Sequence, residues 1–381
     1  MIILTMHYHI ILTEKCNLKC KYCYEKSLNE FDNNLEKKFE FDFGEPSESK
    51  IDLKRLKRFL SKDPEPILIF YGGEPLMKID LIKEIIDELS DLNIKFRMQT
   101  NGMLLDHLPT KYLNKIGKML VSIDGGCKVN DKYRGKGVYE RVIKNLIEAR
   151  NRGYRGEFVA RMTISQEDPD VYKRVKHLVK LINSKIFDSI HWQLDVGFYG
   201  NDFDSKKTEE FFKKYNKSNK KLISWWFKNI KRGKVYKLYP YIGIAKPILL
   251  GKENCGLRCG SGHSGYTITT SGKIVHCPIM NSIKSFQAGS LSSDPKKLEK
   301  FDCVYDCGDC EVYGLCGGRC MYWRRAKLWP KEGDKLICDS IKRYIKEIQK
   351  SMVIIYKLIL KERISAEDFM YEDYFGPEII P

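Results

Sequence analysis

The sequence has no apolar run long enough to cross a membrane. Its longest candidate, Met352–Leu360, is interrupted by Lys357, whereas a membrane-spanning helix needs about 20 predominantly apolar residues. The N-terminal segment contains His7 and His9 and has no basic stretch before its apolar part, so it does not resemble a secretory signal peptide. We also find no internal repeat. These absences predict a cytoplasmic protein that does not bind to a membrane.

Acidic residues are outnumbered by basic ones, 50 against 67, which gives a formal net charge of +17. An excess of this size is compatible with a nucleic-acid partner. The basic residues are dispersed, however, and are interleaved with glutamates in segments such as Lys144–Arg152 and Lys342–Lys350, a pattern that is typical of solvated helix faces. We therefore expect no nucleic-acid partner, and an acidic peptide would account for the remaining basic surface.

The thirteen cysteines do not indicate the disulfide framework of a small secreted protein. The chain is too long for such a framework, and its thiols gather at the short spacings of metal ligands. With 381 residues, of which 43% are hydrophobic, the chain can bury a large core and divide into two domains. A metal-binding protein of a reducing compartment is the interpretation that fits.

Short apolar runs alternate with amphipathic stretches in the first half of the chain. Strands are predicted at 8–12, 67–71, 95–99, 119–123, 157–164 and 191–196. Helices are predicted at 79–89, 139–152 and 170–181, and further along at 208–231 and 341–361. Strands that alternate with helices over this length pair in parallel and carry the helices outside. The sequence therefore predicts an α/β fold.

Cys16, Cys20 and Cys23 follow the first predicted strand, with three residues between the first two and two between the last two. Three thiolates on one short loop can hold three irons of a four-iron cluster and leave the fourth iron open to a further ligand. A zinc knuckle or a chance group of thiols is the alternative. The spacing favours an iron–sulfur cluster that takes part in chemistry.

A second motif, Gly72-Gly73-Glu74-Pro75, follows the second predicted strand. Glycines let the backbone turn tightly and approach a ligand closely, and the carboxylate can pair with an ammonium group. Together with Tyr22, which precedes the last thiol, the two motifs resemble the signatures of the radical S-adenosylmethionine (radical SAM) enzymes. The resemblance implies a partial (β/α)6 TIM-like barrel with its active site at the carboxyl ends of the strands. It assigns S-adenosylmethionine binding to Tyr22, Gly72, Gly73 and Glu74.

Two more predicted strands carry polar residues that alternate with apolar ones. Ser122 and Asp124 share a face, and by the resemblance they bind the ribose of S-adenosylmethionine. Arg161 points inward on the following strand and is assigned to the carboxylate of the cofactor, with a salt bridge inside the barrel as the alternative. The loop that begins at Asn130 departs from the family pattern, which usually has His at that position.

The sixth predicted strand supplies the candidate catalytic residues. His191, Gln193 and Asp195 share one face of this strand, opposite its apolar residues. If the polar face is the interior of the barrel, these side chains line the cavity of the substrate. A single histidine is more often structural than catalytic, so the assignment rests on the three residues together.

The remaining cysteines resemble the SPASM extension of radical SAM proteins, which typically binds two auxiliary four-iron clusters. The resemblance assigns one cluster to Cys255, Cys259, Cys277 and Cys320. It assigns the other cluster to Cys307, Cys310, Cys316 and Cys338. Three four-iron clusters are thus expected in all, and two zinc sites are the alternative for the C-terminal sets, since four thiolates also suit zinc. Cys127 and Cys303 belong to neither set.

The resemblance divides the chain into a radical SAM barrel (1–235), a SPASM domain (236–340) and a C-terminal helix and tail (341–381). It implies reductive cleavage of S-adenosylmethionine to a deoxyadenosyl radical that oxidatively modifies a side chain of a peptide or protein substrate. A small electron donor such as ferredoxin or flavodoxin is the expected partner. Radical modification of a small metabolite is one alternative, and a zinc-stapled nucleic-acid-binding protein is another.

One departure bears on the substrate. Among the members of this group, the anaerobic sulfatase maturases carry an Asp directly after the cysteine that corresponds to Cys277, where it acts as a base. The residue at this position is Pro278, which cannot accept a proton. The sequence therefore argues against that particular activity.

Overall fold

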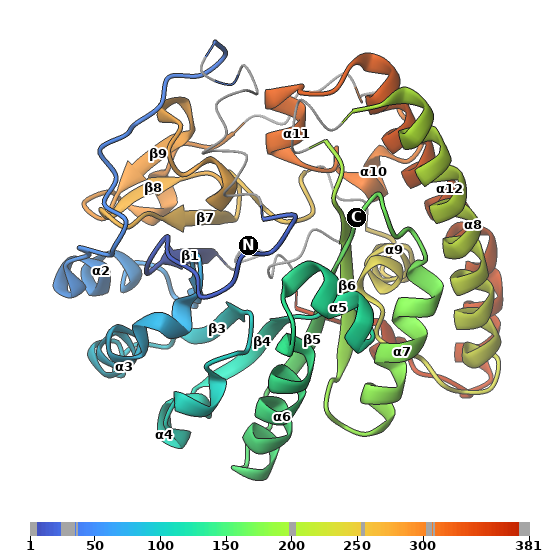
Figure 1. Cartoon of the computed structure of the whole chain (residues 1–381), viewed down its shortest axis with the longest axis horizontal. Coiled ribbons are helices and arrows are strands. Elements are labelled where there is room, and N and C mark those ends of the chain that lie inside the picture. Colours follow the sequence, from blue (N-terminus) through green and yellow to red (C-terminus); the bar gives the residue numbers. More distant parts are fainter. Residues whose placement is uncertain are drawn as a thin grey trace.

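The computed structural model describes residues 6–23, 35, 37–197, 203–252, 256–301, 307 and 309–372. Its described strands form one nine-stranded sheet in the order β6-β5-β4-β3-β2-β1-β7-β8-β9. Figure 1 shows the first six strands fanned across the molecule, with the helices that connect them on the outside. Because β6 and β9 are the two edges, the sheet is open over the part of the chain that the structure describes.

The six strands that the sequence predicts are present and run parallel. They are β1 (His7–Ile11), β2 (Ile67–Tyr71), β3 (Lys95–Thr100), β4 (Ile116–Ser122), β5 (Glu157–Ile164) and β6 (Ser189–Leu194). The helices of this half are α2 (Leu53–Leu60), α3 (Ile79–Glu88), α4 (Thr110–Leu113), α5 (Cys127–Arg134), α6 (Val138–Asn151) and α7 (Val171–Asn183). Consecutive strands are neighbours in the sheet. The predicted α/β fold is confirmed.

The two faces of the parallel strands differ in chemistry because successive side chains point to opposite sides. On one face Tyr8, Ile10 and Phe70 belong to the hydrophobic core that also contains the buried side of α3. The other face carries His7 and His9 of β1, which line a cavity at the carboxyl ends of the strands. The face that carries His7 and His9, called the inner face below, is therefore the face of the candidate site.

The chain beyond residue 236 extends the same sheet, which the sequence pattern did not predict. There β7 (Gly265–Ile268) pairs in parallel with β1, and β8 (Lys273–Val275) and β9 (Gln287–Ser290) continue antiparallel. A Cβ on Gly265 would lie 2.3 Å from Nε2 of His7, so a larger residue there would displace the His7 ring. The sheet joins the predicted barrel to the cysteine-rich region, and the proposed division into domains stays a prediction.

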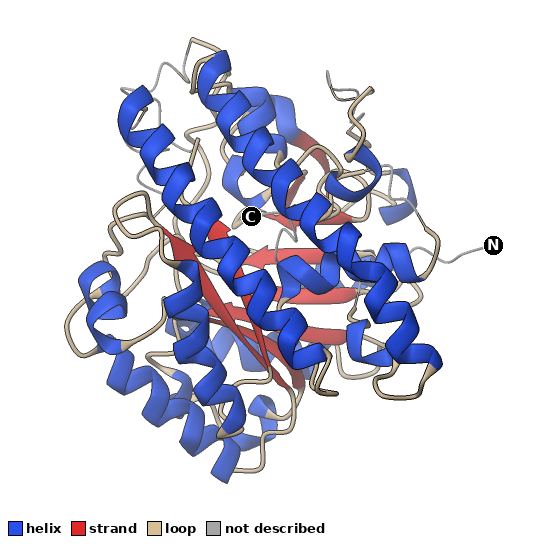
Figure 2. Ribbon diagram, turned by 90° about the vertical axis from the view of Figure 1, so that its right-hand side faces the viewer, coloured by secondary structure: helices blue, strands red, loops and turns tan. Residues whose placement is uncertain are grey.

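The remaining helices pack over the second half. They are α8 (Ser205–Ile230), α9 (Tyr239–Leu249), α10 (Tyr313–Cys316), α11 (Met321–Ala326) and α12 (Lys331–Leu360). The long helices α8 and α12 pack against each other at one side of the molecule and cross in front of the sheet in the turned view (Figures 1 and 2). Among the described helices, none has the length and apolar character that a membrane span requires.

Helix α12 starts ten residues before the predicted start at Ile341. Pro330 precedes its first residue, and Glu332 and Asp334 lie in its first turn, where acidic side chains stabilise the positive end of the helix dipole. The apolar periodicity of the sequence begins later than the helix itself. Cys338 consequently lies on this helix, N-terminal to the segment that the pattern predicted.

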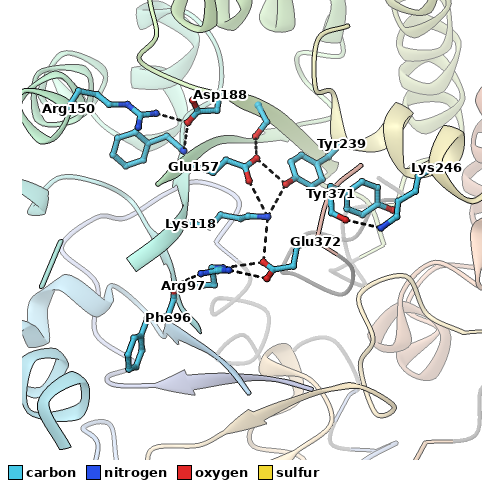
Figure 3. Close-up of polar contacts among 12 residues, drawn as sticks. Phe96, Arg97, Lys118, Arg150, Glu157, Asp188, Tyr239, Lys246, Tyr371 and Glu372 are labelled. Carbon is cyan, nitrogen blue, oxygen red and sulfur yellow. Dashed lines mark hydrogen bonds and ion pairs between the residues drawn. The ribbon is translucent and has the colours of Figure 1, made fainter. Parts of the chain in front are cut away.

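Tyr371 and Glu372, the last described residues, lie against the inner face of the sheet near the amino ends of the strands (Figure 3). Nε and Nη2 of Arg97 donate to the two carboxylate oxygens of Glu372 at 3.1 and 3.0 Å. Nζ of Lys118 lies 3.7 Å from Glu372 and 3.1 Å from Glu157, and Lys246 donates to the Tyr371 carbonyl at 2.8 Å. The tail thus neutralises charges that would otherwise face the interior of the sheet.

Candidate active site

The three N-terminal cysteines lie in the loop after β1 and line one cavity. The backbone N–H of Leu18 donates to the Cys16 sulfur at 3.4 Å, and the Asn101 amide donates to the same sulfur at 3.7 Å. The N–H of Cys23 donates to the Cys20 carbonyl at 3.2 Å. Thiols that share a cavity and receive N–H donors fit an iron–sulfur cluster, because such donors stabilise its sulfur ligands.

The glycine motif holds this cysteine loop in place. The N–H groups of Gly73 and Glu74 donate to the carbonyls of Thr13 and Lys15 at 2.8 and 2.9 Å. A Cβ on Gly72 would lie 2.3 Å from the Thr13 carbonyl oxygen, and a Cβ on Gly73 would lie 2.3 Å from that of Lys15. The two sequence motifs therefore form one unit, in which the glycines allow the cysteine loop to approach.

Glu74 lies at the base of this unit and is 1% exposed. Its carboxylate accepts hydrogen bonds from Leu76 N–H at 3.0 Å, Asn101 N–H at 2.7 Å and the Thr100 hydroxyl at 2.7 Å. Burial raises the pKa of Glu74 to about 7, although these donors oppose the shift. The carboxylate ties the ends of β2 and β3 together, and its predicted contact with a cofactor ammonium group stays a prediction.

Ser122 and Arg161 line the cavity, as the strand alternation predicts. Nη2 of Arg161 donates to Oε1 of Gln193 on the neighbouring strand. Together they place a hydroxyl, a guanidinium and an amide on one wall, a set of groups that can bind the carboxylate and hydroxyls of a cofactor. Their assignment to S-adenosylmethionine stays a prediction.

Asp124 lies elsewhere than the alternation indicates. Because β4 ends at Ser122, the pattern no longer applies at this residue, which is fully buried and is not among the residues that line the cavity. Its carboxylate accepts hydrogen bonds from Arg134, from the Tyr22 hydroxyl and from Thr163 N–H. Asn130 accepts the Asp124 N–H at 3.1 Å. The structure gives Asp124 internal partners, and a contact with ribose stays a prediction.

The candidate catalytic residues of β6 divide into two groups. Gln193 and Asp195 line the cavity, whereas His191 is fully buried and does not line it. His191 pairs with Arg161 in the register of β5 and β6. It precedes Gln193 by two residues along β6, so it lies further from the carboxyl end of that strand. The structure brings two of the three residues to the cavity, and the catalytic roles of all three stay predictions.

Several cavity residues were missed by the sequence reasoning. His9, Tyr71, Thr267 and His276 line the cavity. Burial lowers the pKa of His9 well below its usual value, and nearby His7 and Arg161 add to the effect, so its imidazole stays neutral. The alternation in β1 could have identified His9, whereas Thr267 reaches the site only because β7 pairs with β1.

Two of the C-terminal cysteines also lie at the candidate site. Cys259 and Cys277 line the same cavity as the N-terminal cysteine loop, and Cys320 is buried. Cys255 and Cys303 lie outside the described residues, and Cys127 is an exposed thiol at the start of α5. The structure therefore brings two members of the first predicted C-terminal set to the cavity of the N-terminal cysteines.

The second predicted set is gathered around α10 and α12. Burial raises the pKa of the Cys316 thiol to about 11, and the thiols of Cys338, Cys307 and Cys310 add to this shift, so each of these three lies within electrostatic range of Cys316. Nη2 of Arg324 donates to the Cys307 sulfur at 2.6 Å. No three Cys, His, Asp or Glu side chains of the described residues stand as close as the ligands of a single metal ion. The residues fit a cluster in their grouping and in their donor to sulfur, and the ligand set stays a prediction.

Comparison with known proteins identifies the class. Residues 10–179 match the model of the radical SAM superfamily. The chain is 33% identical over 146 residues to the Fe-coproporphyrin III synthase of Methanosarcina barkeri, a match that covers 37% of this chain and 33% of that protein. It therefore spans about a third of the length of this relative.

Two longer matches extend beyond the superfamily domain. The cysteine-type anaerobic sulfatase-maturating enzyme of Clostridium perfringens is 24% identical over 357 residues, which are 86% of this chain and 92% of that protein. The solved structure of native anSMEcpe with bound AdoMet and Kp18Cys peptide has a TM-score of 0.68 at 17% identity and covers 91% of this chain and 98% of its own. The cysteine-rich C-terminal region thus belongs to the shared fold.

These findings define a radical SAM fold with a cysteine-rich C-terminal region. The chain carries a radical SAM domain over residues 10–179. A domain of this kind implies a four-iron cluster and S-adenosylmethionine.

Proposed function

We propose that this protein is a radical SAM enzyme that oxidatively modifies a side chain of a peptide or protein. The observation that carries the proposal is the shared cavity, which the N-terminal cysteine loop lines together with Cys259 and Cys277 of the C-terminal region. A single site built from both regions suits a substrate that extends from one to the other. The solved structure of native anSMEcpe with bound AdoMet and Kp18Cys peptide supports this choice.

Cys16, Cys20 and Cys23 would hold the cluster of the superfamily, since their thiols line one cavity. When bound and reduced, the cluster and S-adenosylmethionine together supply a deoxyadenosyl radical that removes a hydrogen atom from the substrate. Gly72 and Gly73 keep the cysteine loop against the end of β2. These residues therefore position the reactive centre at the carboxyl ends of the strands.

The wall formed by Ser122, Arg161 and Gln193 would bind the cofactor. Arg161 supplies a fixed positive charge for a carboxylate, and its hydrogen bond to Gln193 holds the guanidinium in one orientation. Tyr22 also lines the cavity next to the thiols. A cofactor held at several points is kept in the geometry that the reaction needs, and water is kept out of the site.

Asp195 is the side chain that we assign to proton transfer. A two-electron oxidation of a substrate removes one hydrogen atom, one electron and one proton, so the site needs a proton acceptor. Asp195 lines the cavity at the carboxyl end of β6, whereas Pro278, also on the cavity wall, cannot take a proton. The carboxylate of Asp195 would therefore accept the proton that Pro278, the residue after Cys277, cannot accept.

Two further four-iron clusters would accept the electron that the substrate loses. The first would be bound by Cys259, Cys277 and Cys320 together with Cys255. The second would be bound by Cys316 together with Cys307, Cys310 and Cys338, whose thiols lie within electrostatic range of that of Cys316. A small electron donor such as ferredoxin or flavodoxin would reduce the N-terminal cluster before each cycle.

Modification of a small metabolite is the second candidate. It is favoured by the relative named Fe-coproporphyrin III synthase, which matches this chain at 33% identity. That match covers 37% of the chain, however, whereas the peptide-bound neighbour is similar over 91%. The longer likeness makes the peptide or protein substrate our first choice.

The experiment follows hydrogen from substrate to cofactor. Purified protein, reconstituted with iron and sulfide without oxygen, is supplied with S-adenosylmethionine, a reductant and an extract of cells grown in deuterated medium. The extract is first divided by ultrafiltration into macromolecules with large peptides and small molecules. We expect deuterium in the 5′-deoxyadenosine, measured by mass spectrometry, with the macromolecular fraction and little with the small molecules.

The control is the variant in which Cys16, Cys20 and Cys23 are all replaced by Ala, which should form no 5′-deoxyadenosine. Deuterium transfer from the small molecules alone would replace the peptide reading with the metabolite reading. Cleavage that is equal in the wild type and the control would contradict the assignment of the cysteine loop.

A further inference from the structure

Arg134, the last residue of α5, lies where the cysteine loop meets the end of β4. Its Nε and Nη2 donate to the two carboxylate oxygens of Asp124 at 2.8 and 3.1 Å. The side chains of Arg134 and Asp124 are 7% and 0% exposed. Two parallel charge-assisted hydrogen bonds fix the plane of the guanidinium. Because both side chains are buried, removing one of them would leave the other as an unpaired buried charge.

The same guanidinium reaches the cysteine loop. Its central carbon lies 5.4 Å from the centre of the Tyr22 ring. The Tyr22 hydroxyl donates to Asp124, so the loop touches both members of the ion pair. Arg134 also lines the cavity, which means that its charge faces the reactive centre.

The neighbouring residue of α5 holds the loop by a separate contact. The N–H of Lys21 donates to the Tyr133 carbonyl at 3.0 Å, and the rings of Tyr22 and Tyr133 lie 5.5 Å apart. Residues 21 and 22 thus both contact the end of α5 or its partner Asp124. The cysteine loop depends on α5 for its conformation in the same way that it depends on the glycine motif.

We propose that Arg134 is a positioning residue for the cysteine loop, and that its charge sets the potential of the cluster bound by that loop. Held by Asp124, the guanidinium fixes the Tyr22 ring, and with it the neighbouring thiols of the loop, in the arrangement that receives the cluster. Its positive charge stabilises the reduced form of the cluster, because reduction adds negative charge beside it. The identity of the cluster rests on the proposed function, whereas the effect on the loop does not.

The test compares Arg134→Gln and Arg134→Lys with the wild type. Arg141→Gln is the matched control. Arg141 lies on α6, forms an ion pair with Asp106 at 2.7 Å, and does not line the cavity. The first readout is hydrogen–deuterium exchange of the peptide that contains Lys21, measured on the metal-free full-length chain. The second is the midpoint potential of the N-terminal cluster after anaerobic reconstitution, measured by redox titration with electron paramagnetic resonance.

In Arg134→Gln we expect exchange at Lys21 to be about tenfold faster or more and the potential to be more negative. Arg134→Lys keeps the charge but loses the planar fork, so its exchange should be fast and its potential close to that of the wild type. Arg141→Gln should change neither. If Arg134→Gln does not fold, Arg134→Lys still tests both roles, because the proposal requires fast exchange at Lys21 together with a wild-type potential in that variant.

Wild-type exchange in both Arg134 variants would overturn the positioning role. Equal potentials in Arg134→Gln and the wild type would overturn the role of the charge. Fast exchange in Arg134→Gln together with a reconstituted wild type that binds no iron would leave the positioning role standing and would contradict the proposed function instead.

Discussion

Arg97 and Glu372 are 275 positions apart in the sequence and form an ion pair with two hydrogen bonds of 3.1 and 3.0 Å. The side chains are 13% and 23% exposed. Lys118, 7% exposed, adds a second positive charge beside them. The tail therefore supplies a carboxylate that two basic residues of the inner sheet face need for balance (Figure 3).

Removing this carboxylate should destabilise the fold. In Glu372→Gln the carboxylate that faces both Arg97 and Lys118 becomes neutral, so we expect the free energy of unfolding to fall by about 2 kcal/mol. Urea denaturation of the metal-free protein measures it. The control is Glu210→Gln, whose pair with Lys214 is 62% and 61% exposed and should matter by less than about 0.5 kcal/mol. Equal effects of the two variants would contradict a role of the tail.

The glycine motif should be essential for the cysteine loop. In Gly72→Ala the new Cβ would meet the Thr13 carbonyl oxygen at 2.3 Å, a backbone atom that cannot move without the loop. We expect the variant to lose most of the iron of the N-terminal cluster after reconstitution. Gly153→Ala separates this clash from backbone strain, because Gly153 also has a positive φ but no atom lies within 4 Å of its Cβ position. Iron retained by Gly72→Ala would show that the loop tolerates displacement.

Glu74 should make stability depend on pH. Burial raises its folded pKa to about 7 from a reference of 4.5, so the folded state keeps a proton that the unfolded state has already released. The stabilisation is complete below about pH 4.5 and is lost as the pH rises through about 7, by about 3 kcal/mol. Because Glu74→Gln does not titrate, the unfolding free energy of the wild type relative to this variant should fall over that window.

Urea denaturation at several pH values measures the difference between the wild type and Glu74→Gln. Glu210→Gln again serves as the control, since the carboxylate of Glu210 is exposed and its pKa is lowered by its hydrogen bond to Lys214, so it should titrate below the window. A difference that stays flat from about pH 4.5 to about 7 would mean that the donors around Glu74 outweigh its burial.

Cys338 should be a ligand of an auxiliary cluster. Replacing it by Ala should cost about four irons per chain, because one thiol of the set around Cys316 is lost. Cys127→Ala is the control, since Cys127 is exposed and belongs to neither C-terminal set. Iron and sulfide analysis of reconstituted protein measures the result. An unchanged iron content in Cys338→Ala would require a different ligand set.

Periodicity predicted the six parallel strands and the helices α3, α6 and α7 of the first half, because alternating strands and long amphipathic helices have periods that a single sequence shows, but the shorter helices α2, α4 and α5 were not predicted. It failed where the pattern was short or interrupted. The three strands β7, β8 and β9 have only three or four residues each, too few for a period to emerge. Helix α12 begins with charged residues that carry no apolar stripe, so its first turns were missed.

The candidate site divides in the same way. Cys16, Cys20 and Cys23 were found because a metal site on one loop leaves its spacing in the sequence. Ser122 and Arg161 were found because they lie within strands, where alternation holds. Asp124 lies beyond the strand end, and there the partner of a carboxylate depends on what the next helix brings. The ion pair with Arg134 could not be read from either residue.

Local spacing and period thus determine which residues bear the chemistry and which elements carry them, since both are properties of neighbours along the chain. Only the tertiary structure decides which of these residues meet. Pairing of β7 with β1 brings Cys259 and Cys277 to the cavity of the N-terminal thiols, and folding of the tail sets Glu372 against Arg97. Contacts of this kind join positions hundreds of residues apart, and their energy depends on burial and charge in the folded state.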